Sequence, residues 1–222
     1  MNGDSTYEPV RRTSTFGWVI LGLGLVLLLT FALATFRLGL LHSRPLPVYG
    51  QVADFALTNQ DGRAFTLADL HGKVWVADVI FTRCAGPCLK MSRQMKELQK
   101  ALPPASKAKL VTLTTDPEFD TPPVLQTYAK RFDADPERWV FLTGRKANVA
   151  RVVGGSLKLT ALEKPAAERS DANDLFIHST YLVLVDQRGQ LRGIFDTSGA
   201  GTDPRQVQTE LLAGIRQLER ER

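Results

Sequence analysis

The only two cysteines of the chain, Cys84 and Cys88, stand in the segment FTRCAGPC with three residues between them. An apolar run over residues 74–81 precedes them and a helical pattern follows, so both thiols lie at a strand-to-helix junction. Sulfur atoms this close in sequence can bind one metal ion or form a disulfide with each other. The spacing is therefore consistent with a redox pair, a metal clamp or a structural disulfide.

The loop between the cysteines predicts an unusual environment for the thiols. We expect Cys84 in the turn after the strand and Cys88 in the first turn of the helix, which Pro87 is well placed to start. Backbone amides without partners and the helix dipole favour an anion at that end. This placement predicts a lowered thiol pKa, with thiolate available near neutral pH.

A third donor would complete a trigonal site suited to copper, and the candidate is His178. It immediately precedes an expected strand that starts at Thr180. The other two histidines lie in a linker (His42) and in a turn (His71). His178 reaches the cysteines only if its strand is a neighbour of the strand before Cys84. A histidine taken alone is more often structural, but the paired cysteines favour a ligand.

Asp78 is a carboxylate inside the apolar run, six residues before Cys84. A buried aspartate needs a hydrogen-bond or charge partner, or its pKa rises, because an unpaired charge in a low dielectric is costly. Asp78 is therefore a candidate proton relay for thiol exchange. An exposed edge position or a structural hydrogen bond explains it equally well, and both interpretations stay open.

The bulk composition limits the function classes. The chain has 222 residues, 44% of them hydrophobic, which suits one domain with a substantial core. Its formal charge of +5 comes from 28 basic and 23 acidic side chains that are scattered along the sequence. No basic block with interleaved aromatic residues is present, which argues against nucleic-acid binding. Two cysteines are too few for a disulfide-stapled scaffold.

An uncharged apolar stretch over residues 16–36 predicts one membrane-spanning helix, because its length matches the hydrocarbon core of a bilayer. The small residues 32–34 resemble a signal-peptide cleavage site, but the stretch is longer than the apolar part of a signal peptide, so we favour an anchor. We assign residues 1–15 to a cytoplasmic tail, 37–47 to a linker and 48–222 to a soluble domain.

The membrane and the orientation are encoded less directly. Acidic residues before the span argue against a mitochondrial presequence and favour a bacterial membrane. Two arginines precede the span and two follow it. The flanking charges alone therefore leave the orientation undecided.

The soluble part alternates strands and helices, which predicts an α/β fold with helices on both faces of a central sheet. Met91 and Met95 repeat at helical spacing, so we interpret them as core side chains although thioethers can bind copper. The stretch 156–174 fits no element, and we interpret it as a long mobile loop with a functional role. The expected elements are a hairpin in 52–73, strands at 74–81, 109–115 and 139–144, helices from 88 and over 121–132, a hairpin across 188–189 and a closing helix over 203–219.

Several motifs in this order resemble the SCO/SenC family, whose members are membrane-anchored, thioredoxin-like, copper-handling proteins. The resemblance extends from about Val52 to the C-terminus. It rests on the cysteine segment with the hairpin and strand before it, on the Asp-Pro segment with its following helix, on a short strand and on the His-Ser strand with its hairpin. These segments span residues 54–88, 114–132, 139–144 and 177–196.

The resemblance implies that Cys84, Cys88 and His178 correspond to the copper ligands of the family. It further implies a role in assembling the dinuclear copper centre of cytochrome c oxidase, with the copper-bearing subunit or another copper protein as partner. Because that centre faces the outside of a bacterial membrane, the domain is expected on the periplasmic or extracytoplasmic side of the inner membrane. Two departures are visible: Leu89 replaces a proline, and Ile177 replaces an acidic residue next to the histidine.

The main alternative is a membrane-anchored thiol-disulfide oxidoreductase that uses Cys84 and Cys88, with Asp78 as relay. Thioredoxins, however, space their cysteines by two residues and place a cis-proline where no proline precedes Thr180 here. A peroxiredoxin is excluded because its required residues before the reactive cysteine are absent. The resemblance therefore favours a metallochaperone over an enzyme, with Cu(I) or Cu(II) as its cargo and thiol reduction as the second interpretation.

Overall fold

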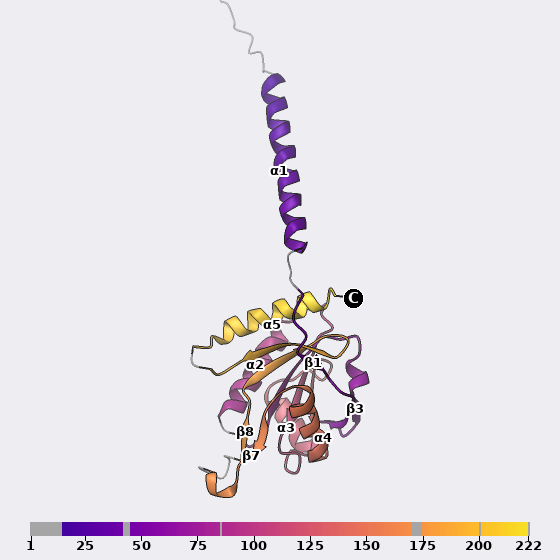
Figure 1. Cartoon of the computed structure of the whole chain (residues 1–222), viewed down its shortest axis with the longest axis vertical. Helices are drawn as coiled ribbons and strands as arrows, with labels where there is room; N and C mark the ends of the chain where they lie inside the picture. The colour runs from indigo at the N-terminus through magenta and orange to yellow at the C-terminus, as the bar shows by residue number, and fades with distance from the viewer. Residues whose placement is uncertain (1–14, 42–44, 85, 170–174, 200, 222) are drawn as a thin grey trace, which may run out of the picture. The chain divides into compact units, whose positions relative to one another are not determined.

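The computed structural model describes residues 15–41, 45–84, 86–169, 175–199 and 201–221. The chain divides into two units, Met1–Pro45 and Leu46–Arg222. In the first, helix α1 (Thr15–Leu41) includes the apolar stretch Gly17–Phe36, which has a mean hydropathy of 2.6 and no buried residues. Its length and composition fit a membrane anchor or a signal sequence (Figure 1).

The second unit is built on an eight-stranded mixed sheet with the strand order β1-β10-β9-β4-β5-β6-β2-β3. Strands β4, β5 and β6 run parallel at its centre, and β9 lies antiparallel to β4. The strands are β1 (Gly50–Gln51), β2 (Ala56–Asn59), β3 (Ala64–Thr66), β4 (Trp75–Ile80), β5 (Lys109–Thr114), β6 (Trp139–Thr143), β9 (Tyr181–Val185) and β10 (Gln190–Asp196).

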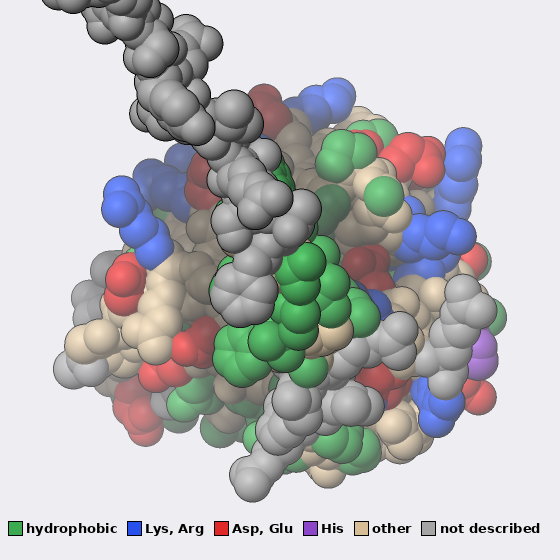
Figure 2. All heavy atoms as spheres, turned by 90° about the horizontal axis from the view of Figure 1, so that it is seen from above, with side chains coloured by type: hydrophobic (Ala, Val, Ile, Leu, Met, Phe, Trp, Pro, Cys, Tyr) green, Lys and Arg blue, Asp and Glu red, His purple; other side chains and the backbone are tan. Residues whose placement is uncertain are grey.

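Helices cover both faces of this sheet, as the sequence predicts. One face packs against α2 (Pro87–Ala101), α3 (Pro122–Arg131) and α5 (Pro204–Leu218). The other packs against the 3-10 helix η1 (Leu67–Leu70), α4 (Lys146–Ala150) and the π-helix η2 (Arg151–Ser156). In Figure 2, acidic and basic side chains are interspersed over the face seen from above, in keeping with the scattered charge of the sequence.

Strand β4 shows why the central sheet is easy to recognise. All six of its residues are buried, because alternate side chains enter the two cores on opposite faces of the sheet. Val76 and Ile80 face α2 and α3, whereas Ala77 and Val79 face η1 and α4. Asp78 shares the face of Val76, so the carboxylate points toward the helix that carries Cys88.

Most predicted elements are confirmed. The first hairpin is β2–β3, and the second is β9–β10, with Gly189 at a φ of 77° in its turn. Helix α2 starts at Pro87 and buries both methionines, so the core interpretation of Met91 and Met95 holds. Thr121 occupies the N-cap position of α3, but its hydroxyl does not cap the helix.

The prediction for residues 156–174 is wrong in part. Two short elements form there, β7 (Ala161–Glu163) and the 3-10 helix η3 (Ala166–Glu168), while residues 170–174 lie outside the described residues. Strand β7 pairs antiparallel with β8 (Phe176–His178) in a separate two-stranded sheet. Three residues are too few to show an alternating pattern, and each strand exists only because the other supplies its hydrogen bonds. Strand β1 and helix α4 were also missed, for the same reason of length.

Candidate metal centre

The cysteine loop leaves the carboxyl end of β4 and enters α2. Cys84 closes a turn in which its backbone N–H donates to the carbonyl of Phe81 at 3.2 Å. Cys88 lies in the first turn of α2, as predicted, and both residues are buried, with 8% and 0% of their surface exposed. Both are thiols in this structure and their side chains interact by a hydrogen bond. Two soft sulfur donors therefore lie side by side beneath the surface.

The expectation of a lowered thiol pKa is wrong for Cys88. Burial raises the pKa of this thiol well above its ordinary value, and the neighbouring Cys84 and the carboxylate of Asp78 raise it further. A backbone hydrogen bond at Phe81 acts in the opposite direction but is the smaller effect. The desolvation of a fully buried thiol thus outweighs the attraction of the helix N-terminus for an anion.

The carboxylate of Asp78 is part of a buried polar cluster beneath the thiols. It is fully buried and accepts a hydrogen bond of 2.6 Å from the hydroxyl of Thr112, which in turn accepts one of 2.8 Å from the indole N–H of Trp139. On the same side of the sheet, the hydroxyls of Ser92 and Tyr128 lie 2.9 Å apart. The exposed-edge explanation of Asp78 is therefore wrong, and a structural hydrogen bond is present.

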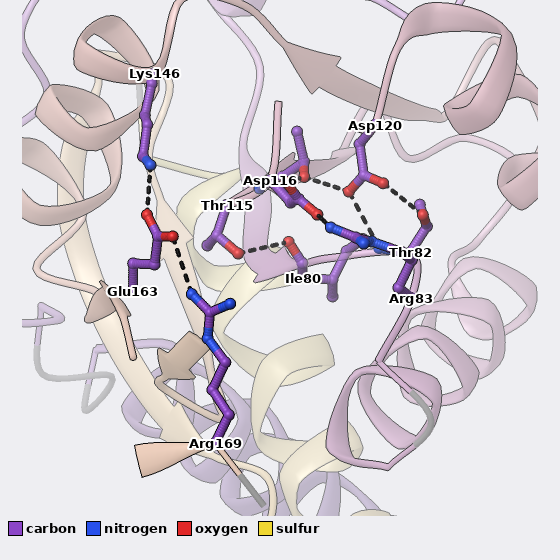
Figure 3. A network of polar contacts seen from close by, with 10 residues as sticks. Ile80, Thr82, Arg83, Thr115, Asp116, Asp120, Lys146, Glu163 and Arg169 are labelled. Carbon is purple, nitrogen blue, oxygen red and sulfur yellow. Dashed lines mark hydrogen bonds and ion pairs between the residues drawn. The ribbon is translucent and has the colours of Figure 1, made fainter. Parts of the chain in front are cut away.

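The neighbouring loop after β5 holds the cysteine loop in place (Figure 3). The guanidinium of Arg83 pairs with the carboxylate of Asp116 at 2.5 Å and lies 4.2 Å from the centre of the Phe119 ring. The backbone N–H of Thr82 donates to Asp120 at 3.1 Å, and the hydroxyl of Thr82 donates to the same carboxylate. Two residues directly before Cys84 are thus clamped to one loop.

Asp120 is the buried centre of this clamp. Its carboxylate also accepts from the hydroxyl of Thr114, and none of its surface is exposed. Burial raises the pKa of Asp120, while the hydrogen bonds from Thr114 and Thr82 partly oppose that rise. Sequence reasoning assigned no role to Arg83, Asp116 or Asp120. The two aspartates of the segment TTDPEFD were the available signal.

The strand that contains His178 lies next to the cysteine loop. Strand β9 pairs antiparallel with β4, so the start of β9 and the end of β4 meet at one edge of the sheet. The ring of Phe176, two residues before His178, lies 5.1 Å from the ring of Phe81, three residues before Cys84. The expected strand from Thr180, here β9, is therefore a neighbour of β4, and His178 itself lies just before it, in β8.

The small sheet fixes the backbone of His178. This residue is opposite Ala161 of β7, and the backbone N–H of the next residue, Ser179, donates to the carbonyl of Thr160 at 2.9 Å. Glu163 of β7 accepts from Lys146 of α4 at 2.6 Å, which ties the sheet to the rest of the unit. The side chain of His178 lies outside what the structure describes.

The donor set fits a soft metal ion as far as the described side chains reach. Within them, no group of three His, Cys, Asp or Glu side chains converges, and the histidine in question is not among them. His71 is exposed at the end of η1. A three-donor site would therefore consist of the two thiols and the imidazole of His178, whose backbone belongs to β8.

Comparison with known proteins agrees with this geometry. The model of the SCO1/SenC family matches residues 47–213, which is most of the chain and includes every residue of the cysteine loop and of β8. The chain belongs to the SCO1/SenC family. The resemblance seen in the sequence motifs is therefore confirmed.

Relatives of known sequence or structure support this membership. An SCO1 protein homolog of Bacillus subtilis (strain 168) is 32% identical over 160 residues, which are 71% of this chain and 79% of that protein. BsSco, described as a member of the Sco family of cytochrome c oxidase assembly proteins with a disulfide switch, superimposes with a TM-score of 0.66 at 26% identity, covering 81% of this chain and 100% of BsSco.

A copper-bound relative has the same fold. Bradyrhizobium japonicum ScoI with copper bound gives a TM-score of 0.62 at 25% identity, over 76% of this chain and 99% of that protein. These SCO1/SenC structures confirm the mixed α/β, thioredoxin-like architecture. Of the two departures from the family pattern, Leu89 packs half-buried against the core beside Cys88, whereas the side chain of Ile177 lies outside the described residues.

Proposed function

We propose that the protein is a copper-binding assembly protein that loads the copper-bearing subunit of cytochrome c oxidase. The thiolates of Cys84 and Cys88 and the imidazole of His178 hold the ion, as Cu(I) or Cu(II). The observation that carries the proposal is the contact between Phe81 and Phe176, because it brings the strand of His178 to the cysteine loop. The copper-bound state of Bradyrhizobium ScoI supports it by family membership.

The chemistry of the donors suits this cargo. Thiolate and imidazole are the ligands that copper prefers over harder oxygen donors. Both thiols must lose their protons when they bind the ion, so uptake releases protons and becomes stronger as the pH rises. Because burial raises the pKa of Cys88, its thiol stays protonated until the ion replaces the proton. The site then discriminates against weakly binding cations.

The domain is expected to work outside the cytoplasm. In this proposal residues 1–15 form the cytoplasmic tail, 16–36 the membrane anchor, 37–47 the linker and 48–222 the copper-binding domain. The apolar helix α1 supports an anchor. A reporter enzyme that works only in the periplasm should be active when it is fused to the C-terminus. An inactive reporter would show that the domain faces the cytoplasm.

Anaerobic Cu(I) titration of the full chain in detergent tests the three-donor site. The wild type should bind one ion, and Cys84→Ser or Cys88→Ser should abolish stoichiometric binding. His178→Ala should weaken the affinity about 10-fold or more, since a ligand is lost while the thiolates remain. His71→Ala, an exposed histidine, is the matched control. Equal affinity in the His178→Ala and His71→Ala variants would show that the imidazole is no ligand.

The second candidate function is reduction of a client disulfide, favoured by the hydrogen bond between the two thiols and by Asp78 beneath them. One thiolate attacks a sulfur of the client disulfide, and the other thiolate resolves the mixed disulfide. The client gains two electrons and two protons, and Cys84 and Cys88 become a disulfide. Asp78→Asn should slow this reaction if the carboxylate relays the proton, and Thr112→Val is the control for loss of the hydrogen bond alone. A rate independent of Asp78 removes the relay.

A further inference from the structure

A groove lies between α2 and α5, and none of the side chains that line it is a proposed copper ligand. It has a volume of about 330 Å³, within the lower range of ligand-binding clefts. Its floor is apolar and consists of core side chains of α2, β9 and α5. The lining residues that matter here are Leu98, Leu182, Val207 and Leu211 on the floor, and Lys90, Arg93, Gln94, Glu97 and Arg205 on the rim.

The rim of the groove is positively charged. Lys90, Arg93 and Arg205 form no ion pair with any other residue that the structure describes. The one acidic rim residue, Glu97, pairs with Lys100 at 2.9 Å. An apolar slot bordered by three cations is complementary to an apolar side chain flanked by acidic groups.

Gln94 has an acceptor atom without a partner among the described residues, which indicates that an occupant of the groove carries a hydrogen-bond donor. Its side-chain N–H group donates to the carbonyl of Thr197 at 3.4 Å, while its side-chain oxygen is buried and accepts no hydrogen bond from the described residues. A buried acceptor without a donor is costly, so such groups in native proteins call for a specific explanation. Gln94 is half-buried as a whole, so a turn of its side chain toward the groove would expose this oxygen, and a peptide N–H from an occupant could then supply the missing hydrogen bond.

The position of the groove connects it with the thiols. Lys90, Arg93, Gln94 and Glu97 follow one another at helical spacing on one face of α2. Helix α2 begins beside Cys88, and five residues of helix correspond to about 7.5 Å along the axis. The groove therefore begins within the first two turns of α2 after Cys88, about 3 to 8 Å along the helix axis.

We propose that the groove between α2 and α5 is the docking surface for the client of the copper site, and that it binds a client segment with an apolar side chain next to acidic residues. When the segment binds, the side chain of Gln94 turns toward the groove and its oxygen accepts a hydrogen bond from a backbone N–H of the segment. An acyl chain of an anionic lipid would also fill the floor, but it contains no donor for Gln94. The inference rests on the proposed function, since it assigns the occupant as the copper client.

The test measures binding of the purified, soluble copper-bearing domain of the oxidase subunit from the same organism to the full chain in detergent micelles. Triple reversal to Glu at Lys90, Arg93 and Arg205 should weaken the dissociation constant about 10- to 100-fold and remove most of its dependence on salt. Gln94→Leu should weaken it severalfold without changing charge. The matched control reverses three exposed cations elsewhere in the unit: Arg63, Lys130 and Arg151.

Each outcome decides the inference. Loss of affinity confined to the groove variants supports it, whereas unchanged affinity, or an equal loss in the control, overturns it. Displacement of the domain by added phosphatidylglycerol through the same three cations identifies a lipid site and also overturns it. If the wild-type chain does not bind the domain, the inference is also overturned.

Copper titration of the same samples separates this inference from the proposed function. If the chain binds no copper at Cys84 and Cys88 while the groove variants still lose affinity for the domain, the proposed copper function is rejected and the docking surface is supported. If copper binds and is transferred to the domain at the same rate by the wild type and the groove variants, the docking surface is rejected and the copper function is supported.

Discussion

Replacing Phe176 by alanine should separate the small β7–β8 sheet from the cysteine loop. The rings of Phe176 and Phe81 are 5.1 Å apart with an interplanar angle of 58°, a geometry that contributes about 1 kcal/mol beyond the area it buries. Deleting a fully buried phenylalanine costs about 3–5 kcal/mol, and Phe176 is only partly buried. We therefore expect the free energy of unfolding to fall by about 2 kcal/mol.

The consequence for copper follows from the position of His178 on the same strand. The pair contact of about 1 kcal/mol holds β8 against the loop, and its loss corresponds to about a fivefold change in an equilibrium constant. We expect Phe176→Ala to weaken Cu(I) binding by about that factor. Phe176→Leu, which keeps an apolar side chain at this position, should lose less.

Competition with a Cu(I) chelator gives the affinity, and urea titration followed by circular dichroism gives the stability. Phe65→Ala is the matched control, because Phe65 is also partly buried but packs on the opposite face of the sheet. If both alanine variants are destabilised alike and both bind copper like the wild type, then the ring contact does not position the histidine strand.

Three further predictions concern the surroundings of the site. Burial raises the pKa of Asp120 above its ordinary 3.8, so its contribution to stability is greatest below that value and is lost as the pH rises through the raised one. Asp120→Asn should flatten the fall of unfolding free energy as the pH rises above about 4, and urea titrations that show an unchanged slope would contradict this. Asp186→Ala leaves the buried guanidinium of Arg192 without its 2.7 Å partner and should cost about 3 kcal/mol by thermal or chemical unfolding; a loss below about 1 kcal/mol would mean that the other partners of Arg192 suffice. Met95→Leu should cost less than about 1.5 kcal/mol and leave Cu(I) stoichiometry intact, whereas lost copper would make the thioether a ligand.

Local patterns determined much of the architecture. The apolar stretch of α1, the buried strand β4 and the start of α2 at Pro87 are all readable because each depends on the composition or period of adjacent residues. The cysteine pair and its place at the strand-to-helix junction followed in the same way. The motifs around them were sufficient to indicate the family.

Short elements escaped the sequence because they depend on partners distant in the chain. Strands β7 and β8 have three residues each and are stabilised by pairing with each other, and β1 has two residues. Helix α4 continues directly into the π-helix η2, which no sequence pattern predicts. Periodicity needs more residues than these elements contain.

Reading the residues alone identified the donors: two thiols at one junction, and a histidine ahead of a later strand. The folded arrangement was needed to learn that β9 lies beside β4, that Phe176 contacts Phe81, and that the pKa of Cys88 rises. The reason is physical. Donor types and local spacing are properties of adjacent residues, whereas strand adjacency and desolvation are sums over everything packed around a group, most of it distant in the chain.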